Sequence, residues 1–154
     1  MSLGGHLLAQ GPGPTPEEGT GAAATASSVA VTSLNLSGTD LGDGVYQGEA
    51  SCTFTACCSN VGSTPMYCSS KLEVGIPGLS QDVIEVPLQL PYTNMTTVAP
   101  GQTITWSFDN ADPGPAPTFV DYTSDGRLRA FADVHGFQGS SLVDSDSDLE
   151  LLTF

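Results

Sequence analysis

The sequence predicts an all-β fold, an antiparallel β-sandwich of about seven strands, on three observations. Short segments alternate apolar and polar residues with a period of two, as half-buried strands do. Residues that favour turns interrupt the alternation about every 8 to 12 residues, which is the spacing typical of a sandwich. No segment of useful length carries the 3.6-residue apolar stripe of an amphipathic helix.

Residues 1–28 are predicted to form a flexible N-terminal arm rich in glycine, proline and alanine. Proline and glycine prevent regular strand pairing, and the segment has little apolar surface to bury. Two interpretations remain open. The segment is a disordered tail, or it drapes over a neighbouring subunit with Leu3, Leu7 and Leu8 as its anchor.

The predicted sandwich spans residues 29–135 and begins with a strand over Val29–Leu36. The apolar phase of this strand changes between Val31 and Leu34, which predicts a β-bulge. A turn-rich loop over residues 37–44 follows.

The next two segments, residues 48–58 and 66–74, both alternate strictly. Between them, residues 60–65 are rich in types that turn a chain. The pattern therefore predicts that the two segments form one β-hairpin.

All four cysteines lie in this predicted hairpin. With the turn centred between the strands, Cys58 lies nearly opposite Cys68 on the buried face, and a one-residue slip would place Cys57 there instead. We expect one disulfide that involves Cys68, with Cys58 as its candidate partner. The alternative is that all four remain reduced in a reducing cytosol, as small buried apolar residues or spare thiols.

Further strands are predicted downstream. Residues 82–90 are expected to form an edge strand because Pro87 cannot donate to a ladder, and residues 102–108 form the next strand. Residues 118–122 and 127–134 are predicted to pair as a final hairpin. The predicted core side chains are Phe54, Leu72, Val74, Ile104, Trp106 and Phe108.

Residues 136–154 are predicted to form a separate C-terminal tail that is first acidic and then apolar. An apolar end on an acidic spacer is expected to add as a strand to an exposed sheet edge. That edge belongs either to a neighbouring subunit or to the tail's own sandwich. The candidate assembly contacts in the tail are Leu149, Leu151, Leu152 and Phe154.

Three short motifs resemble a known family. They are residues 59–63 (SNVGS), 98–106 (VAPGQTITW) and 129–134 (RAFADV), and together they are similar to the prokaryotic and viral immunoglobulin-like modules of the CARDB type. The resemblance implies an immunoglobulin-like sandwich over roughly residues 29 to 135, a fold that hosts many functions. The cysteine cluster and the long proline-rich run after Phe108 depart from the family pattern.

The excess of acidic over basic residues argues against some classes of binding partner. The chain has 17 acidic and three basic residues and a formal net charge of -14, which argues against binding nucleic acid or anionic lipid. No apolar run approaches the roughly 20 residues of a membrane-spanning helix, so we expect no membrane insertion. The first residues lack the basic and apolar regions of a secretion signal. This favours a virion protein assembled in the host cytoplasm, and an extracellular or cell-surface location is the alternative.

No motif for catalysis, cofactor binding or metal binding stands out. Neither His6 nor His135 belongs to a nucleophile motif, and we expect no cofactor and no metal. Residues 144–148 begin like a calcium loop, but the glycine required next is Leu149. Three acidic loop pairs are interpreted as turn residues, with a shared cation as the alternative: Asp40 with Asp43, Asp109 with Asp112, and Asp121 with Asp125.

These observations together favour a non-enzymatic structural assembly protein. The most concrete form is a virion component such as a capsid decoration protein, which clamps neighbouring subunits through its arm and tail. Its expected partner is itself or a major structural protein, in a homo-oligomer. The alternatives are a surface-displayed adhesin or ligand-binding immunoglobulin-like module, and a filament or pilus subunit that uses strand complementation.

Overall fold

The fold is all-β. The computed structural model of the 154-residue chain describes residues 15–17, 26–77, 92–112, 114–121 and 124–154. None of these residues belongs to a helix long and apolar enough to cross a membrane. The strands in chain order are β1 (Thr15–Glu17), β2 (Ser28–Gly42), β3 (Val45–Cys57), β4 (Met66–Gly75), β5 (Tyr92–Val98), β6 (Thr103–Asp109), β7 (Thr118–Val120), β8 (Arg127–Gln138) and β9 (Ser141–Thr153).

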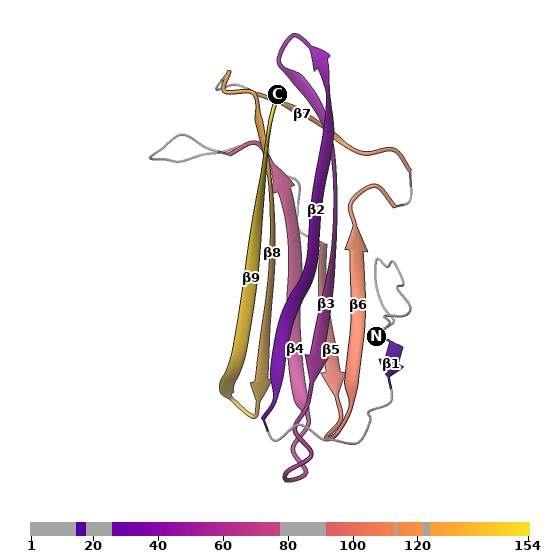
Figure 1. The fold of residues 1–154 in the computed structure, drawn as a ribbon, viewed down its shortest axis with the longest axis vertical. Coiled ribbons are helices and arrows are strands. Elements are labelled where there is room, and N and C mark those ends of the chain that lie inside the picture. The colour runs from indigo at the N-terminus through magenta and orange to yellow at the C-terminus, as the bar shows by residue number, and fades with distance from the viewer. Residues whose placement is uncertain (1–14, 18–25, 78–91, 113, 122–123) are drawn as a thin grey trace.

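Two antiparallel sheets stack face to face as a sandwich (Figure 1). Sheet A has the strand order β1-β6-β3-β2, and the short strand β7 also pairs with β3. Sheet B has the order β5-β4-β8-β9. The β2–β3 hairpin extends beyond the other strands at the end of the sandwich where the C-terminus lies (Figure 1).

Six of the seven longer strands are divided between the sheets as in the predicted immunoglobulin-like sandwich. In such sandwiches the first, second and fifth strands share one sheet, and the third, sixth and seventh share the other. Here β2, β3 and β6 share sheet A, while β4, β8 and β9 share sheet B. The remaining long strand, β5, differs from the constant-type arrangement, in which the fourth strand joins the first sheet, because it lies at the edge of sheet B beside β4.

The core lies between the sheets and contains all six predicted core residues, each at most 5% exposed. Phe54 lies at its centre, with ring centroids 5.6 Å from Trp106 and 6.0 Å from Phe108. The indole Nε1–H of Trp106 donates a hydrogen bond of 2.8 Å to Ser70 Oγ on the facing sheet. This buried bond joins β6 of sheet A to β4 of sheet B.

The predicted bulge in the first strand is confirmed. The register between β2 and β3 shifts between Val31 and Ser33. Before the shift Val29 faces the core, and after it Leu34 does so. The extra residue therefore keeps both apolar runs of β2 on the same side of the sheet.

The predicted hairpin of residues 48–58 and 66–74 is wrong. These residues form β3 and β4, which lie in different sheets. Alternation identifies the buried face of a strand but not its neighbour. The connecting residues 58–65 are longer than a tight hairpin loop, and they carry the chain from one sheet to the other.

The predicted final hairpin is also wrong. β7 pairs with β3, with Val120 opposite Val45, while β8 pairs with β4 and β9. The observed adjacent pairs are β2 with β3 and β8 with β9. The predicted strand over residues 82–90 lies outside the described residues.

The predicted boundaries of the arm and the tail require correction. Within the predicted arm, Thr15–Glu17 pairs with β6 and Ser28 begins β2. Residues 1–14 and 18–25, which include Leu3, Leu7 and Leu8, lie outside the described residues. At the other end, β8 continues to Gln138 and β9 pairs with it along its length. The predicted tail is therefore the last strand of the sandwich rather than a separate segment.

Candidate interaction surface

The outer face of sheet B can be assigned from burial and register. The buried residues of β4 and β8 include Leu72, Val74, Leu128 and Val134, all with even numbers. Because successive side chains point to opposite faces, the odd-numbered residues of both strands lie on the outer face. Directly opposed residues of an antiparallel pair share a face, so register extends this assignment to the flanking strands β5 and β9.

This outer face gathers exposed apolar side chains. Of the ten large hydrophobic residues that are exposed among the described residues, five lie on it. Two partly buried aromatic residues accompany them, because Phe131 is opposite Leu149 and Phe137 is opposite Tyr67 and Leu142. The five exposed residues are Tyr67 (47%), Met95 (74%), Leu142 (53%), Leu149 (50%) and Leu151 (51%).

The same face carries every basic residue of this acidic chain. Lys71 lies on β4, and Arg127 and Arg129 lie on β8. Register places Lys71 opposite Asp133 and Arg129 opposite Leu151. The outer face of sheet B thus combines exposed apolar side chains with all three basic residues and with the carboxylates of Glu73 and Asp133.

Two of the three basic residues form ion pairs with carboxylates of their own chain. Lys71 Nζ is 3.3 Å from a carboxylate oxygen of Glu73 and 5.8 Å from the ring centroid of Phe131. Arg127 is 3.2 Å from Asp125. Arg129 makes no ion pair with the described part of the chain.

The outer face of sheet A has a different character between β3 and β6. Hydroxyl and thiol side chains of the two strands pair across the ladder there. At one end of this polar region the Glu49 carboxyl lies beside Asp109. Burial, followed by the charge of Asp109 and a hydrogen bond to it, raises the pKa of Glu49. The paired side chains are Thr53 with Ser107 (3.0 Å), Thr55 with Thr105 (3.3 Å) and Cys57 with Thr103 (3.0 Å).

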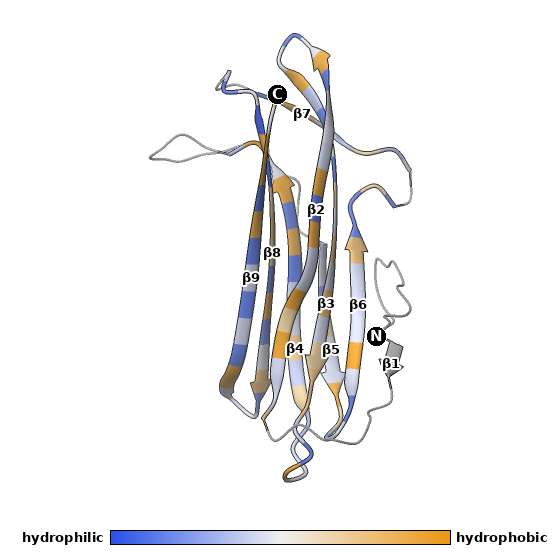
Figure 2. Cartoon of the chain, in the orientation of Figure 1, coloured by the Kyte–Doolittle hydropathy of each residue, from blue (hydrophilic) through white to orange (hydrophobic). Residues whose placement is uncertain are grey.

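Carboxylates of β9, at the edge of sheet B, accept hydrogen bonds from the backbone of β2, at the edge of sheet A. The backbone N–H of Val29 donates to Asp144 Oδ2 at 2.9 Å, and that of Val31 donates to Asp146 Oδ2 at 2.8 Å. Two acidic side chains spaced two residues apart thus occupy the edge of β2 that pairs with no other strand of the described residues. In Figure 2 this acidic stretch appears as the hydrophilic middle of β9.

The four predicted assembly residues of the tail divide into two groups. Leu149 and Leu151 are exposed on the outer face of sheet B. Leu152 packs against the core, and the Phe154 ring stacks on Tyr46 with ring centroids 4.5 Å apart. The tail therefore packs on its own sandwich while leaving two leucines exposed.

Of this surface, sequence reasoning identified only Leu149 and Leu151 as candidate contacts. The alternation in residues 66–74 places Tyr67 and Lys71 on the face opposite the apolar one, but it does not show what lies beside them. The signal that would have found it is the other phase of residues 127–133, where Arg127, Arg129 and Phe131 recur at a spacing of two.

No protein-family model, curated protein or solved structure matches this chain. The likeness to CARDB-type modules therefore stays a prediction, and the surface has to be interpreted from its own chemistry.

The predicted disulfide between Cys58 and Cys68 is absent, and all four cysteines are free thiols. The two residues belong to segments of different sheets rather than to one hairpin, so the expected register does not exist. Burial raises the pKa of Cys52 and of Cys68 to about 12. Both thiols are therefore protonated at neutral pH, which makes them poor nucleophiles.

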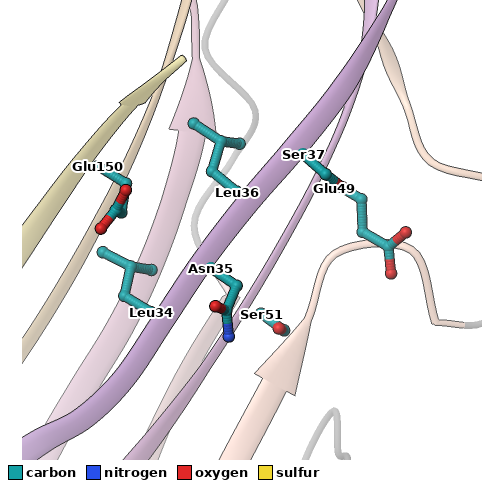
Figure 3. Close-up of a pocket in the computed structure, with 7 residues that line it drawn as sticks. All are labelled: Leu34, Asn35, Leu36, Ser37, Glu49, Ser51 and Glu150. Carbon is teal, nitrogen blue, oxygen red and sulfur yellow. The ribbon is translucent and has the colours of Figure 1, made fainter.

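A shallow polar pocket of about 460 Å³ lies around the middle of β2. Figure 3 shows that its lining divides between two sides of this strand. Leu34, Leu36 and Glu150 lie on one side, and Asn35 and Glu49 lie on the other. Its two carboxylates do not converge on a common point, and paired acid–base catalysis needs such convergence.

The acidic loop residues act mainly as turn caps. Asp40 Oδ1 accepts the backbone N–H of Gly42 at 2.8 Å, and Asp109 Oδ1 accepts that of Ala111 at 2.9 Å. No group of three or more metal-ligating side chains occurs in the described part of the chain. Asp121 is the most buried of these caps, at 6% exposure.

Replacing Asp121 by asparagine is expected to lower the free energy of unfolding by about 2 kcal/mol. The Asp121 carboxylate accepts the N–H of Ser124 at 3.0 Å and that of Gly126 at 2.7 Å. An asparagine amide has one oxygen and one NH2 group. One of these two backbone N–H groups would therefore face the NH2 donor instead of an oxygen acceptor. Urea denaturation measures the loss, and the exposed Asp43→Asn variant is the control, with an expected change within about 0.5 kcal/mol.

Proposed function

We propose that this chain is a non-enzymatic structural assembly protein that binds a structural partner through the outer face of sheet B. The observation that carries the proposal is the concentration of exposed apolar residues and all basic residues on one sheet face of a chain with net charge -14. Interfaces are enriched in aromatic residues, methionine and arginine, and each of these occurs on this face.

The other properties of the chain favour a protein partner over nucleic acid, lipid or a substrate. A strongly acidic chain repels nucleic acid and anionic lipid. Protonated buried thiols and the divided lining of the β2 pocket offer little support for an enzyme. A capsid decoration protein is one concrete form of such an assembly module, with a partner that is itself or a major structural protein.

The mode of contact differs from the clamp that the sequence suggested. Because β9 is already paired with β8, the tail contributes the exposed Leu149 and Leu151 as part of a rigid sheet. A rigid face loses less conformational entropy on binding than a tail that must first be ordered. The proposed module therefore binds through a preformed surface.

Sedimentation of the chain from the cells that produce it tests this proposal. We expect the tagged chain to sediment with a large assembly, and the Leu149→Glu, Leu151→Glu double variant to remain near the top of the gradient. Two buried carboxylates without partners would oppose docking on an apolar contact.

Leu41→Glu is the matched control, because Leu41 is 52% exposed but lies at the β2–β3 hairpin. This control should sediment like the wild-type chain. If the double variant sediments like the wild-type chain as well, or if the wild-type chain is itself at the top, the proposal is rejected.

A further inference from the structure

On the outer face of sheet B, the side chains of the two central strands, β4 and β8, form pairs of residues that lie directly opposite one another. β4 presents Tyr67, Ser69, Lys71, Glu73 and Gly75 in order along the strand. At the same heights β8 presents Phe137, His135, Asp133, Phe131 and Arg129. An aromatic ring is thus level with an aromatic ring, and a cation is level with a carboxylate.

We infer that this face binds a second copy of the chain across a two-fold axis that runs along the strands between β4 and β8. The inference rests on the proposed function and names the partner of the same surface. Such an axis exchanges the two central strands. Tyr67 of one copy then lies over Phe137 of the other, and Lys71 lies over Asp133.

Each of these contacts occurs twice, as a two-fold interface requires. Arg129, which makes no ion pair with the described residues of its own chain, would then lie diagonally across from the partner's Glu73.

Charge favours a second copy at this face over contact elsewhere on the surface. Two chains of net charge -14 repel one another in general. At this face Lys71, Arg127 and Arg129 balance Glu73, Asp133 and Asp125. Because charges are screened over about 8 Å at physiological salt, the local balance decides whether two faces can approach.

The size of the face is sufficient for a reversible dimer. Four strands spaced about 4.8 Å apart and about ten residues long cover roughly 600 Å² on each copy. Face-to-face contact would then bury about 1,200 Å² in total, above the roughly 1,000 Å² expected of a specific interface. An interface at this lower end of the range is expected to dissociate on the order of micromolar concentration.

Analytical ultracentrifugation of the purified full-length chain with Lys71→Glu and Asp133→Lys variants tests the inference. The wild-type chain should show a monomer–dimer equilibrium. Each variant alone should weaken the dimer by about tenfold or more, because like charges meet twice across the axis. An equimolar mixture of the two variants should recover dimer formation to within about threefold of wild type, because opposite charges meet twice in the mixed dimer.

The recovery in the mixture can arise only from contact between chains, so it separates an interface from an effect on folding. Val61→Glu and Asp148→Lys are the controls. They shift charge in the same directions as the two variants, but in the exposed connection between the sheets and on the other side of β9, respectively. Both should dimerise within about threefold of wild type.

Three results would overturn the inference. They are a wild-type chain that stays monomeric up to about 1 mM, dimerisation that both variants retain, and a mixture that dimerises no better than either variant alone. If the purified chain is monomeric but the leucine double variant still loses the native assembly, the face binds a different protein. In that case the proposed function stands and the two-fold dimer does not.

Discussion

Replacing Trp106 by alanine is expected to lower the free energy of unfolding by about 3–5 kcal/mol. The indole is 2% exposed and packs beside Phe54 between the two sheets. Its removal would leave a cavity, and the buried Ser70 hydroxyl would lose the Nε1–H donor at 2.8 Å. Urea denaturation followed by tryptophan-independent far-ultraviolet circular dichroism measures this change.

The control for this substitution is Val61→Ala, because Val61 is 70% exposed in the connection between the sheets. A change within about 0.5 kcal/mol is expected for the control. A Trp106→Ala loss no larger than that of the control would mean that the indole is not a central part of the core. Ser70→Ala, measured alone and with Trp106→Ala, should show a non-additive effect because the two side chains share a hydrogen bond.

The fold class and the core were accessible from sequence because alternation is a local signal. In β3, the residues from Ala50 to Ala56 alternate so strictly that the buried face is defined without knowledge of any neighbouring strand. The bulge near Val31 was accessible for the same reason, since it appears as a change of phase within one strand.

Strand neighbours were not accessible, because they depend on contacts between distant parts of the chain. β3 and β4 are consecutive and both alternate, yet they lie in different sheets. Nothing in the sequence of either segment indicates that β3 pairs with β6 or that β4 pairs with β8. The disulfide prediction for Cys58 and Cys68 failed with the hairpin on which it depended.

Most of the candidate surface was missed because alternation within one strand does not show which residues the neighbouring strands add to the same face. Lys71 and Arg129 are far apart in sequence, and they lie on neighbouring strands only because β8 pairs with β4. Before that pairing is known, each is an isolated basic residue in an acidic chain. The gathering of all basic residues on one face is therefore a property of the fold and not of any motif.

The acidic repeat of β9 likewise has a structural role that its sequence did not suggest. Residues 144–148 resemble the start of a calcium loop, but they lie in a regular strand. Asp144 and Asp146 point toward β2 and accept two of its backbone N–H groups. An alternating run of acids can thus protect a sheet edge that lacks a neighbouring ladder.

Replacing Asp144 and Asp146 together by alanine is expected to lower the free energy of unfolding by about 2–3 kcal/mol, because two charge-assisted hydrogen bonds at a partly exposed seam are lost. The amide protons of Val29 and Val31 should also exchange faster with solvent, which hydrogen-exchange measurements detect directly.

Asp148→Ala is the matched control for this double variant, because Asp148 Oδ1 accepts the N–H of its neighbour Leu149 and, within the described part of the chain, no N–H of β2. It removes a carboxylate from the same strand without opening the edge of β2, so the two amides should keep their protection. Unchanged exchange at Val29 and Val31 in the double variant would show that packing between β2 and β9, rather than the carboxylates, closes the sandwich at this edge.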